Sequence, residues 1–212
     1  MNTPSSVSLV RRQREREETR QRILEAARQM LVRHGYEATT MRAIAARIGY
    51  TATALYHHFK DKDALVAELA AVDFRALGRA LQEAGSIADP VARLERIGEA
   101  YVEFGLSHPM QYQFLFMTRH HEEGRHEHPH GDPGLECYGF LRQTCAEAIA
   151  TGRLWPEFVD ADELAQIAWG SLHGIVALQV TLGDEPKFRW ADVRAEGRKL
   201  TRTITRGLLR TP

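Results

Sequence analysis

Hydrophobic positions recur along the chain at intervals of three and four, which is the spacing of one face of an α-helix. The first clear stripe consists of Ile23, Leu24, Ala27, Met30 and Leu31. Comparable stripes return as far as the C-terminal residues, whereas alternation with a period of two never extends beyond a few positions. The pattern predicts an all-α fold.

Capping residues and glycines divide the first third of the chain. Thr40, Thr51 and Asp61 are residue types that cap helix N-termini, and Gly35 and Gly49 suit the backbone that ends a helix. Residues 1–18 mix Ser, Pro, Arg and Glu without periodicity, and we expect a flexible N-terminal arm there. The predicted helices span residues 19–34, 40–49, 51–59 and 62–81.

The rest of the chain repeats this style with longer helices. Asp89–Pro90 and Asp132–Pro133 place a proline where a helix begins, a position that proline favours. These pairs open helices that are predicted to end at Ser107 and Gly152, and Pro109 interrupts the chain after the first of them. A further helix is predicted over the charge-free segment 164–183, and the last one starts near residue 190.

The charge-free segment holds twenty residues, close to the length of a membrane span. It contains Gln166, His173 and Gln179, and the chain has no second segment of this kind. We therefore expect a helix buried on all sides in a protein core, and no membrane partner. Two cysteines without a Cys-x-x-Cys pair, and an N-terminus without the apolar core of a signal peptide, favour the cytoplasm.

The last helix carries an apolar stripe that suits packing against another helix. Together with the charge-free helix, this stripe exceeds the apolar surface that one small body easily covers. We therefore expect a homodimer. The predicted interface residues are Ile167, Ile175, Leu178, Val193, Leu200, Ile204 and Leu208.

Charge is distributed unevenly although the total is zero. Residues 1–62 carry twelve Lys and Arg against six Asp and Glu, whereas residues 63–212 carry sixteen against twenty-two. The chain thus has a basic first part and an acidic second part. This asymmetry points to a polyanionic partner for the first part alone.

Residues 40–59 predict a helix-turn-helix, because two short helices are joined by a tight glycine turn and follow a supporting helix. The positions predicted to point outward carry hydroxyls, cations and aromatic rings with polar tips, and none is acidic. Such groups suit contacts with phosphates and base edges in a major groove of double-stranded DNA. The candidate DNA-binding residues are Thr40, Arg42, Thr51, Ala52, Thr53, Tyr56, His57, Lys60 and Lys62.

Residues 19–69 resemble the DNA-binding domain of the TetR family of transcriptional repressors. The matching positions are Ile23-Leu24-x-Ala-Ala, His34-Gly35-Tyr36, Thr39-Thr40, Ile44-Ala45, Gly49, Thr51, Leu55-Tyr56-x-x-Phe59 and Lys62-x-x-Leu65. The resemblance implies a helix-turn-helix domain over 19–65 and a helical ligand-binding and dimerisation domain over 66–212. Trp169-x-x-x-His173-Gly174 also resembles the Trp-His-Gly type of that second domain.

The resemblance further implies a ligand-responsive regulator, a repressor that binds a palindromic operator as a dimer and is released by a small-molecule inducer. Thr40 and Arg42 would then contact phosphates, and Thr51 to Thr53 would lie nearest the bases. Tyr56, His57 and Lys62 would grip phosphates on either side. Ala52 and Ala54 depart from the usual polar residues, so more of the readout would come from methyl contacts or DNA shape.

Four arginines lie before the predicted first helix, at positions 11, 12, 14 and 16. They could reach an adjacent minor groove as an arm. The interleaved acidic residues at 15, 17 and 18 favour a solvated tail instead.

The acidic second part is expected to hold an unknown small molecule in an apolar cavity between helices, with His173 as its polar anchor. Met and aromatic stripes also form ordinary cores, so core packing remains the alternative for each of these residues. The candidate pocket residues are Tyr101, Phe104, Phe114, Met117, Phe140, Trp169, His173 and Val176.

Five of the ten histidines lie between His120 and His130. Imidazoles at that density can bind zinc, nickel or copper, which leaves open a metal-responsive regulator using His126, His128 and His130. A solvated loop is the simpler interpretation, so no cofactor and no preformed metal site are predicted. An enzyme using Cys137 or Cys145 with a histidine is a further alternative, but the sequence contains no Gly-rich phosphate loop and no Gly-x-Ser-x-Gly motif, and we expect no enzyme.

Overall fold

The computed structural model describes residues 6–119 and 133–210, and these form nine helices. The described residues contain no strand, only an isolated bridge between Leu154 and Leu209. The predicted all-α class is therefore confirmed. The described chain divides into two compact units: residues 6–70 with 113–119, and residues 71–112 with 133–210.

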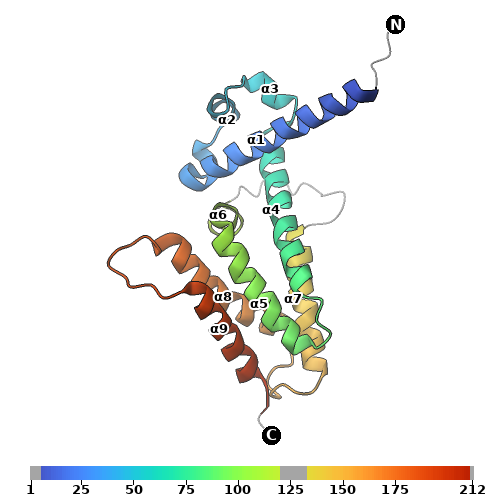
Figure 1. Ribbon diagram of the computed structural model, residues 1–212, viewed down its shortest axis with the longest axis vertical. Coiled ribbons are helices and arrows are strands. Elements are labelled where there is room, and N and C mark those ends of the chain that lie inside the picture. Colours follow the sequence, from blue (N-terminus) through green and yellow to red (C-terminus); the bar gives the residue numbers. More distant parts are fainter. Residues whose placement is uncertain (1–5, 120–132, 211–212) are drawn as a thin grey trace. The chain divides into compact units, whose positions relative to one another are not determined.

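The first unit contains α1 (Ser6–Ala38), α2 (Met41–Arg47), α3 (Ala52–Tyr56) and the beginning of α4 (Lys62–Ala84) (Figure 1). Its core is formed by the apolar stripe of α1 and the inner faces of α2 and α3, as the sequence predicts. Ile23, Ile44 and Leu55 have no exposed surface. These contacts fix the orientation of α2 and α3 on α1.

Two glycines shape this unit as predicted. Gly35 has a φ of 77°, and it interrupts the helical backbone of α1 at the predicted helix end. Gly49, with a φ of 74°, forms the turn that follows α2. Backbone with positive φ costs little only at glycine, so both residues are required by the local geometry.

The helix α1 begins at Ser6 rather than at Thr19, so our expectation of a non-helical arm was wrong for residues 6–18. Side chains four residues apart form ion pairs there, with Arg11 Nε 3.5 Å from Glu15 and Arg14 Nε 2.8 Å from Glu18. Such pairs support an exposed helix. Our prediction of helices relied on apolar stripes, and a helical extension that packs against no core carries no such stripe.

The second unit contains the end of α4, α5 (Pro90–Ser107), the beginning of α6 (Pro109–Met117), α7 (Pro133–Ala150), α8 (Ala161–Leu182) and α9 (Val193–Leu208). The helix α5 lies at its centre and packs against α7, α8 and α9. A side chain at Gly105 would place Cβ 2.4 Å from Val176 Cγ1, so glycine permits the close approach of α5 to α8. Gly197 permits a similar approach of α9 to Val102 on α5.

The charge-free segment forms α8 but is not buried on all sides, so that expectation was wrong. Leu172 and Val176 are buried against the rest of the unit, whereas Ile167 and Leu178 are 43% and 47% exposed. Absence of charge does not distinguish a helix buried in one chain from a helix with one uncovered apolar face. No helix in the described ranges is long and apolar enough to cross a membrane.

Candidate DNA-binding surface and ligand cavity

Threonine hydroxyls cap both short helices of the first unit. Thr40 Oγ1 accepts a hydrogen bond from Ala43 N, and Thr51 Oγ1 accepts one from Ala54 N, each at 3.2 Å. Each hydroxyl thus satisfies one of the backbone donors that a helix start leaves without a partner. Its own hydrogen remains available for a contact outside the protein.

Seven of the nine predicted DNA-binding residues are exposed, and they form the outer face of α2, α3 and the residues that flank these helices. Tyr56 is 54% exposed. Ala52 is half-buried. We call this face the head surface, and its exposed members are Thr40, Arg42, Thr51, Thr53, Tyr56, His57 and Lys60.

Lys62 is placed differently from the other candidates. It is half-buried, its Nζ donates a hydrogen bond to the Tyr36 carbonyl at 3.0 Å, and it lies 3.6 Å from the centroid of the Tyr36 ring. The Tyr36 hydroxyl donates to Asp63. Burial and the Asp63 carboxylate raise the pKa of Tyr36. Lys62 therefore joins the beginning of α4 to the end of α1.

Arg20 fastens α1 to the segment after α3, a role that the sequence did not reveal. Its Nη1 donates to the His58 carbonyl at 2.9 Å, its guanidinium lies 4.3 Å from the centroid of the Phe59 ring, and it pairs with Glu68. Burial lowers the pKa of His58, as do the charges of Arg16 and Arg20. The partners are far apart in sequence, so no local pattern could have indicated this contact.

In the second unit, Tyr101, Tyr112 and His173 form a hydroxyl–imidazole cluster. The His173 Nδ1 lies 2.6 Å from the Tyr112 hydroxyl and 3.2 Å from that of Tyr101, and the two hydroxyls are 3.1 Å apart. Trp169 Nε1 donates to the Tyr101 hydroxyl at 3.0 Å. Burial raises the pKa of Tyr101 to about 12 and lowers the pKa of His173. The cluster is therefore neutral near pH 7.

This cluster brings together three predicted pocket residues and adds Tyr112, which our list missed. The other five candidates are placed as follows. Val176 packs beneath Gly105, and Phe104 and Phe140 line two separate cavities. Phe114 and Met117 belong to the first unit, where Phe114 is buried and Met117 is 40% exposed.

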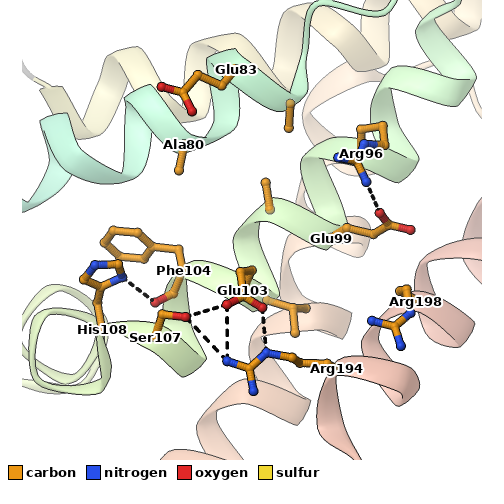
Figure 2. Close-up of a pocket in the computed structure, with 13 residues that line it drawn as sticks. Ala80, Glu83, Arg96, Glu99, Glu103, Phe104, Ser107, His108, Arg194 and Arg198 are labelled. Carbon is orange, nitrogen blue, oxygen red and sulfur yellow. Dashed lines mark hydrogen bonds and ion pairs between the residues drawn. The ribbon is translucent and has the colours of Figure 1, made fainter.

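A cavity of about 530 Å³ lies between α4, α5 and α9, and Phe104 forms part of its wall. Figure 2 shows charged side chains around it, and Arg194 of α9 reaches Glu103 of α5. The Arg194 Nε–Glu103 Oε2 distance is 2.7 Å, and Ser107 Oγ donates to Glu103 at 2.5 Å. These contacts lower the pKa of Glu103. This cavity is charged, whereas we expected an apolar one. Its other charged lining residues are Glu83, Arg96, Glu99 and Arg198.

The residues of the two alternative functions are placed as follows. Cys145 has no exposed surface, and burial raises the pKa of its thiol to about 12, which makes it unsuited to act as a nucleophile. The Cys137 thiol donates to the Phe74 carbonyl at 3.3 Å. His126, His128 and His130 lie outside the described residues. Within residues 6–119 and 133–210 there is no group of three or more His, Cys, Asp or Glu side chains that could hold a metal.

The predicted dimer residues fall into two sets. Ile167 and Leu178 on α8 are exposed and Ile175 is half-buried, and a Cβ added at Gly170 or Gly174 would meet open space. On α9, Val193 and Leu208 are buried within the unit, and Leu200 and Ile204 are half-buried. Only the α8 set thus leaves an apolar face uncovered.

Comparison with family models covers both units. Residues 23–69 match the model described as bacterial regulatory proteins, tetR family. Residues 94–196 match the model described as tetracyclin repressor-like, C-terminal domain. The first match ends within α4, next to the boundary at residue 70 between the two units, and the second begins within α5.

Individual curated relatives match about a third of this chain or less. The chain is 38% identical over 68 residues to the HTH-type transcriptional repressor AcnR of Corynebacterium diphtheriae, a match that covers 32% of this chain and 36% of the relative. It thus spans about a third of the length of such curated relatives. A structure of a protein with unknown function from Rhodococcus sp. RHA1 is 26% identical with a TM-score of 0.69, covering 90% of this chain and 95% of that chain. The ketosteroid transcriptional regulator KstR2 of Mycobacterium tuberculosis shares the fold, at 22% identity and a TM-score of 0.68 over 91% of this chain and 96% of that chain.

Proposed function

Because the chain belongs to the tetR family of bacterial regulatory proteins, we propose that it is a sequence-specific, DNA-binding transcriptional regulator. It represses transcription by binding a palindromic operator as a homodimer, and a small-molecule inducer releases it. The relative AcnR is described as a transcriptional repressor. The proposal assigns the chain no catalytic role and places it in the cytoplasm with its DNA.

The head surface is the observation that carries this proposal. Leu55 and Phe59 anchor α3 in the core, and Thr53 and Tyr56 point away from it into solvent. Arg42 and Lys60 add positive charge on either side of α3, and no acidic residue lies among the exposed members of the surface. A helix with hydroxyls at its centre and cations at its flanks suits insertion into a major groove, with phosphate contacts on both sides.

Arg42 and Lys60 provide a test of the head surface that needs no knowledge of the operator. Binding to a random-sequence duplex is measured by fluorescence anisotropy at several salt concentrations. We expect Arg42→Met and Lys60→Met each to reduce the slope of log affinity against log salt by about 0.9 per bound subunit, because each removes one phosphate contact. Arg202→Met, an exposed change on α9, is the control and leaves the slope unchanged. Equal salt slopes for the wild type and all three variants would contradict the proposed surface.

The uncovered face of α8 is proposed as the homodimer interface. Ile167 and Leu178 supply apolar contact, and Gly170 and Gly174 between them allow the same helix of a second copy to approach closely. Such a two-fold interface pairs like surfaces and requires an operator with two-fold symmetry. Half-sites would then be about 34–36 Å apart, or a multiple of this distance.

Ile167→Asp with Leu178→Asp is expected to give monomers in sedimentation, whereas Val159→Asp, at an exposed residue outside this face, is expected to leave dimers.

The cavity between α4, α5 and α9 is proposed as the inducer site. Ala80, Glu83 and Ala84 of α4 line it, and α4 contributes residues to both units. A ligand that displaces this end of α4 would change the separation of the two DNA-binding parts of a dimer. Coupling of this kind amounts to about 1–3 kcal/mol, or a 5- to 150-fold change in DNA affinity.

The inducer site is tested with a library of small polar molecules, which is screened for release of DNA from the wild-type protein. Compounds that release DNA are expected to lose this effect on Ala84→Trp, which fills the cavity, and to retain it on Ala150→Trp, an exposed change at the end of α7 outside this cavity. A compound that binds tightly in the cavity and leaves DNA affinity unchanged would contradict the mechanism.

A further inference from the structure

The helical extension of α1 arranges its arginines in two separate sets. Successive residues of an α-helix are about 100° apart around its axis, so positions 12, 16 and 20 lie within about 80° of arc. Positions 11, 14 and 18 lie within about 60° on the opposite side. Residues 9–18 are exposed throughout, so Arg12 and Arg16 on one side and Arg11 and Arg14 on the other side all face solvent.

Ion pairing distinguishes the two sets. Arg11 pairs with Glu15 and Arg14 pairs with Glu18, so each of these cations has a carboxylate beside it. Glu17 accepts a hydrogen bond from Gln21 Nε2 at 2.7 Å. Within the described ranges, Arg12 and Arg16 form no ion pair with a carboxylate. Two unneutralised cations therefore occupy one side of the extension.

The side that carries Arg12 and Arg16 is continuous with the head surface. Arg20, the next member of the row, donates to the carbonyl of His58, immediately after the exposed His57. Arg16 lies near enough to His58 for its charge to lower the pKa of that imidazole. In Figure 1 the N-terminal turns of α1 continue beyond α3. The row from position 12 to position 20 is about 12 Å long at a rise of about 1.5 Å per residue.

We propose that the extension of α1 is a second DNA-contacting element, in which Arg12 and Arg16 bind backbone phosphates of the duplex that flanks the base pairs reached by α3. The inference rests on the proposed DNA-binding function. Arg12 and Arg16 lie about 6 Å apart along the helix axis, which is close to two phosphate steps of one strand at about 3.4 Å of axis per phosphate. The guanidinium group of arginine can donate two parallel hydrogen bonds to the oxygens of one phosphate. A rigid helix would hold these groups along the sugar-phosphate backbone of the DNA rather than within a groove.

The experiment compares two double variants with equal loss of charge. Arg12→Gln with Arg16→Gln removes the unpaired set, and Arg11→Gln with Arg14→Gln removes the paired set. The probes are a duplex that the wild-type protein selects from a random pool, the same duplex with ten added base pairs at each end, and versions with A·T-rich or G·C-rich additions. Affinity is measured from 50 to 200 mM salt, and circular dichroism verifies the helix content.

On the extended duplex, Arg12→Gln with Arg16→Gln is expected to reduce the salt slope by about 1.8 per subunit, at about 0.9 per phosphate. Across that salt range this removes roughly a tenfold change in affinity per subunit. On the unextended duplex this variant and the wild type are expected to bind equally. The control pair is expected to leave both slopes nearly unchanged, because its arginines have carboxylate partners and lie on the other side of the helix.

Three results would overturn the inference. Equal effects of the two double variants would indicate a response to net charge alone, and no effect of Arg12→Gln with Arg16→Gln would remove the contact. An effect confined to A·T-rich additions would indicate an arm in the minor groove. In all three cases the wild-type protein still binds its selected duplex, whereas failure of the proposed function would appear as no selected duplex at all.

Discussion

Replacement of Lys62 by methionine separates a structural role from a phosphate contact. Methionine keeps a straight apolar side chain and removes the ammonium, which donates to the Tyr36 carbonyl at 3.0 Å and lies 3.6 Å from the ring centroid. A hydrogen bond from a charged group contributes about 1.5–3 kcal/mol, and a cation over an exposed ring about 0.5–1 kcal/mol. Both values fall towards their lower limits because Lys62 is only half-buried.

An opposing term reduces the loss. Lys62 is the first residue of α4, where a positive charge faces the positive end of the helix dipole at a cost of about 0.3–1 kcal/mol. We therefore expect Lys62→Met to destabilise the first unit by about 1–2 kcal/mol. The salt slope of DNA binding is expected to change by much less than the value of about 0.9 that one phosphate contact contributes.

The assay follows urea unfolding with two signals. All three tryptophans belong to the second unit, so their fluorescence reports that unit, whereas far-ultraviolet circular dichroism reports both. Lys62→Met should shift only the circular dichroism transition. The exposed Lys60→Met is the control, with stability unchanged and the salt slope reduced. If Lys62→Met reduced the slope by about 0.9 per subunit at unchanged stability, the structural role would be refuted.

Three further outcomes are expected. Gly49→Ala should cost about 1–2 kcal/mol of stability in the first unit, because a φ of 74° is strained for alanine even though no atom obstructs the new Cβ. Equal circular dichroism transitions of this variant and the wild type would contradict this. Gly105→Ala should destabilise the second unit by about 1–3 kcal/mol, because the new methyl group would collide with Val176 Cγ1. Val176→Ala should then cost less stability in the Gly105→Ala protein than in the wild type. Additive losses would exclude this contact as the cause. Burial lowers the pKa of His173, so this imidazole binds a proton more readily in the unfolded chain than in the folded one. The stability that depends on neutral His173 should therefore be fully present above about pH 6.5 and decline as the pH falls towards the folded-state pKa. His173→Asn should flatten this decline in tryptophan-detected unfolding, and an unchanged pH profile would assign it to other groups.

Features determined by neighbouring residues were predictable from the sequence. Thr40 and Thr51 cap their helices, Asp89 caps α5, and Gly49 forms the turn after α2, as expected. Each depends on hydrogen bonds or backbone angles within a few residues. With these two helices placed, the spacing of their apolar residues also predicted which residues of the head surface are exposed.

Features that depend on distant partners were not predictable. Glu68 lies forty-eight positions after Arg20, and His173 lies sixty-one positions after Tyr112. Periodicity shows which face of a helix is apolar, but not which helix covers it. For this reason Val193 and Leu208, which we assigned to a dimer interface, are buried within their own unit.

The central claim is that this chain recognises a specific, two-fold symmetric DNA sequence through α3. The most direct measurement is selection of the purified protein against a random pool of duplexes, followed by sequencing of the bound fraction. The account predicts enrichment of an inverted repeat, and its loss when Thr53→Ala and Tyr56→Phe are combined. No enrichment by a protein that is helical by circular dichroism and dimeric in sedimentation would contradict it.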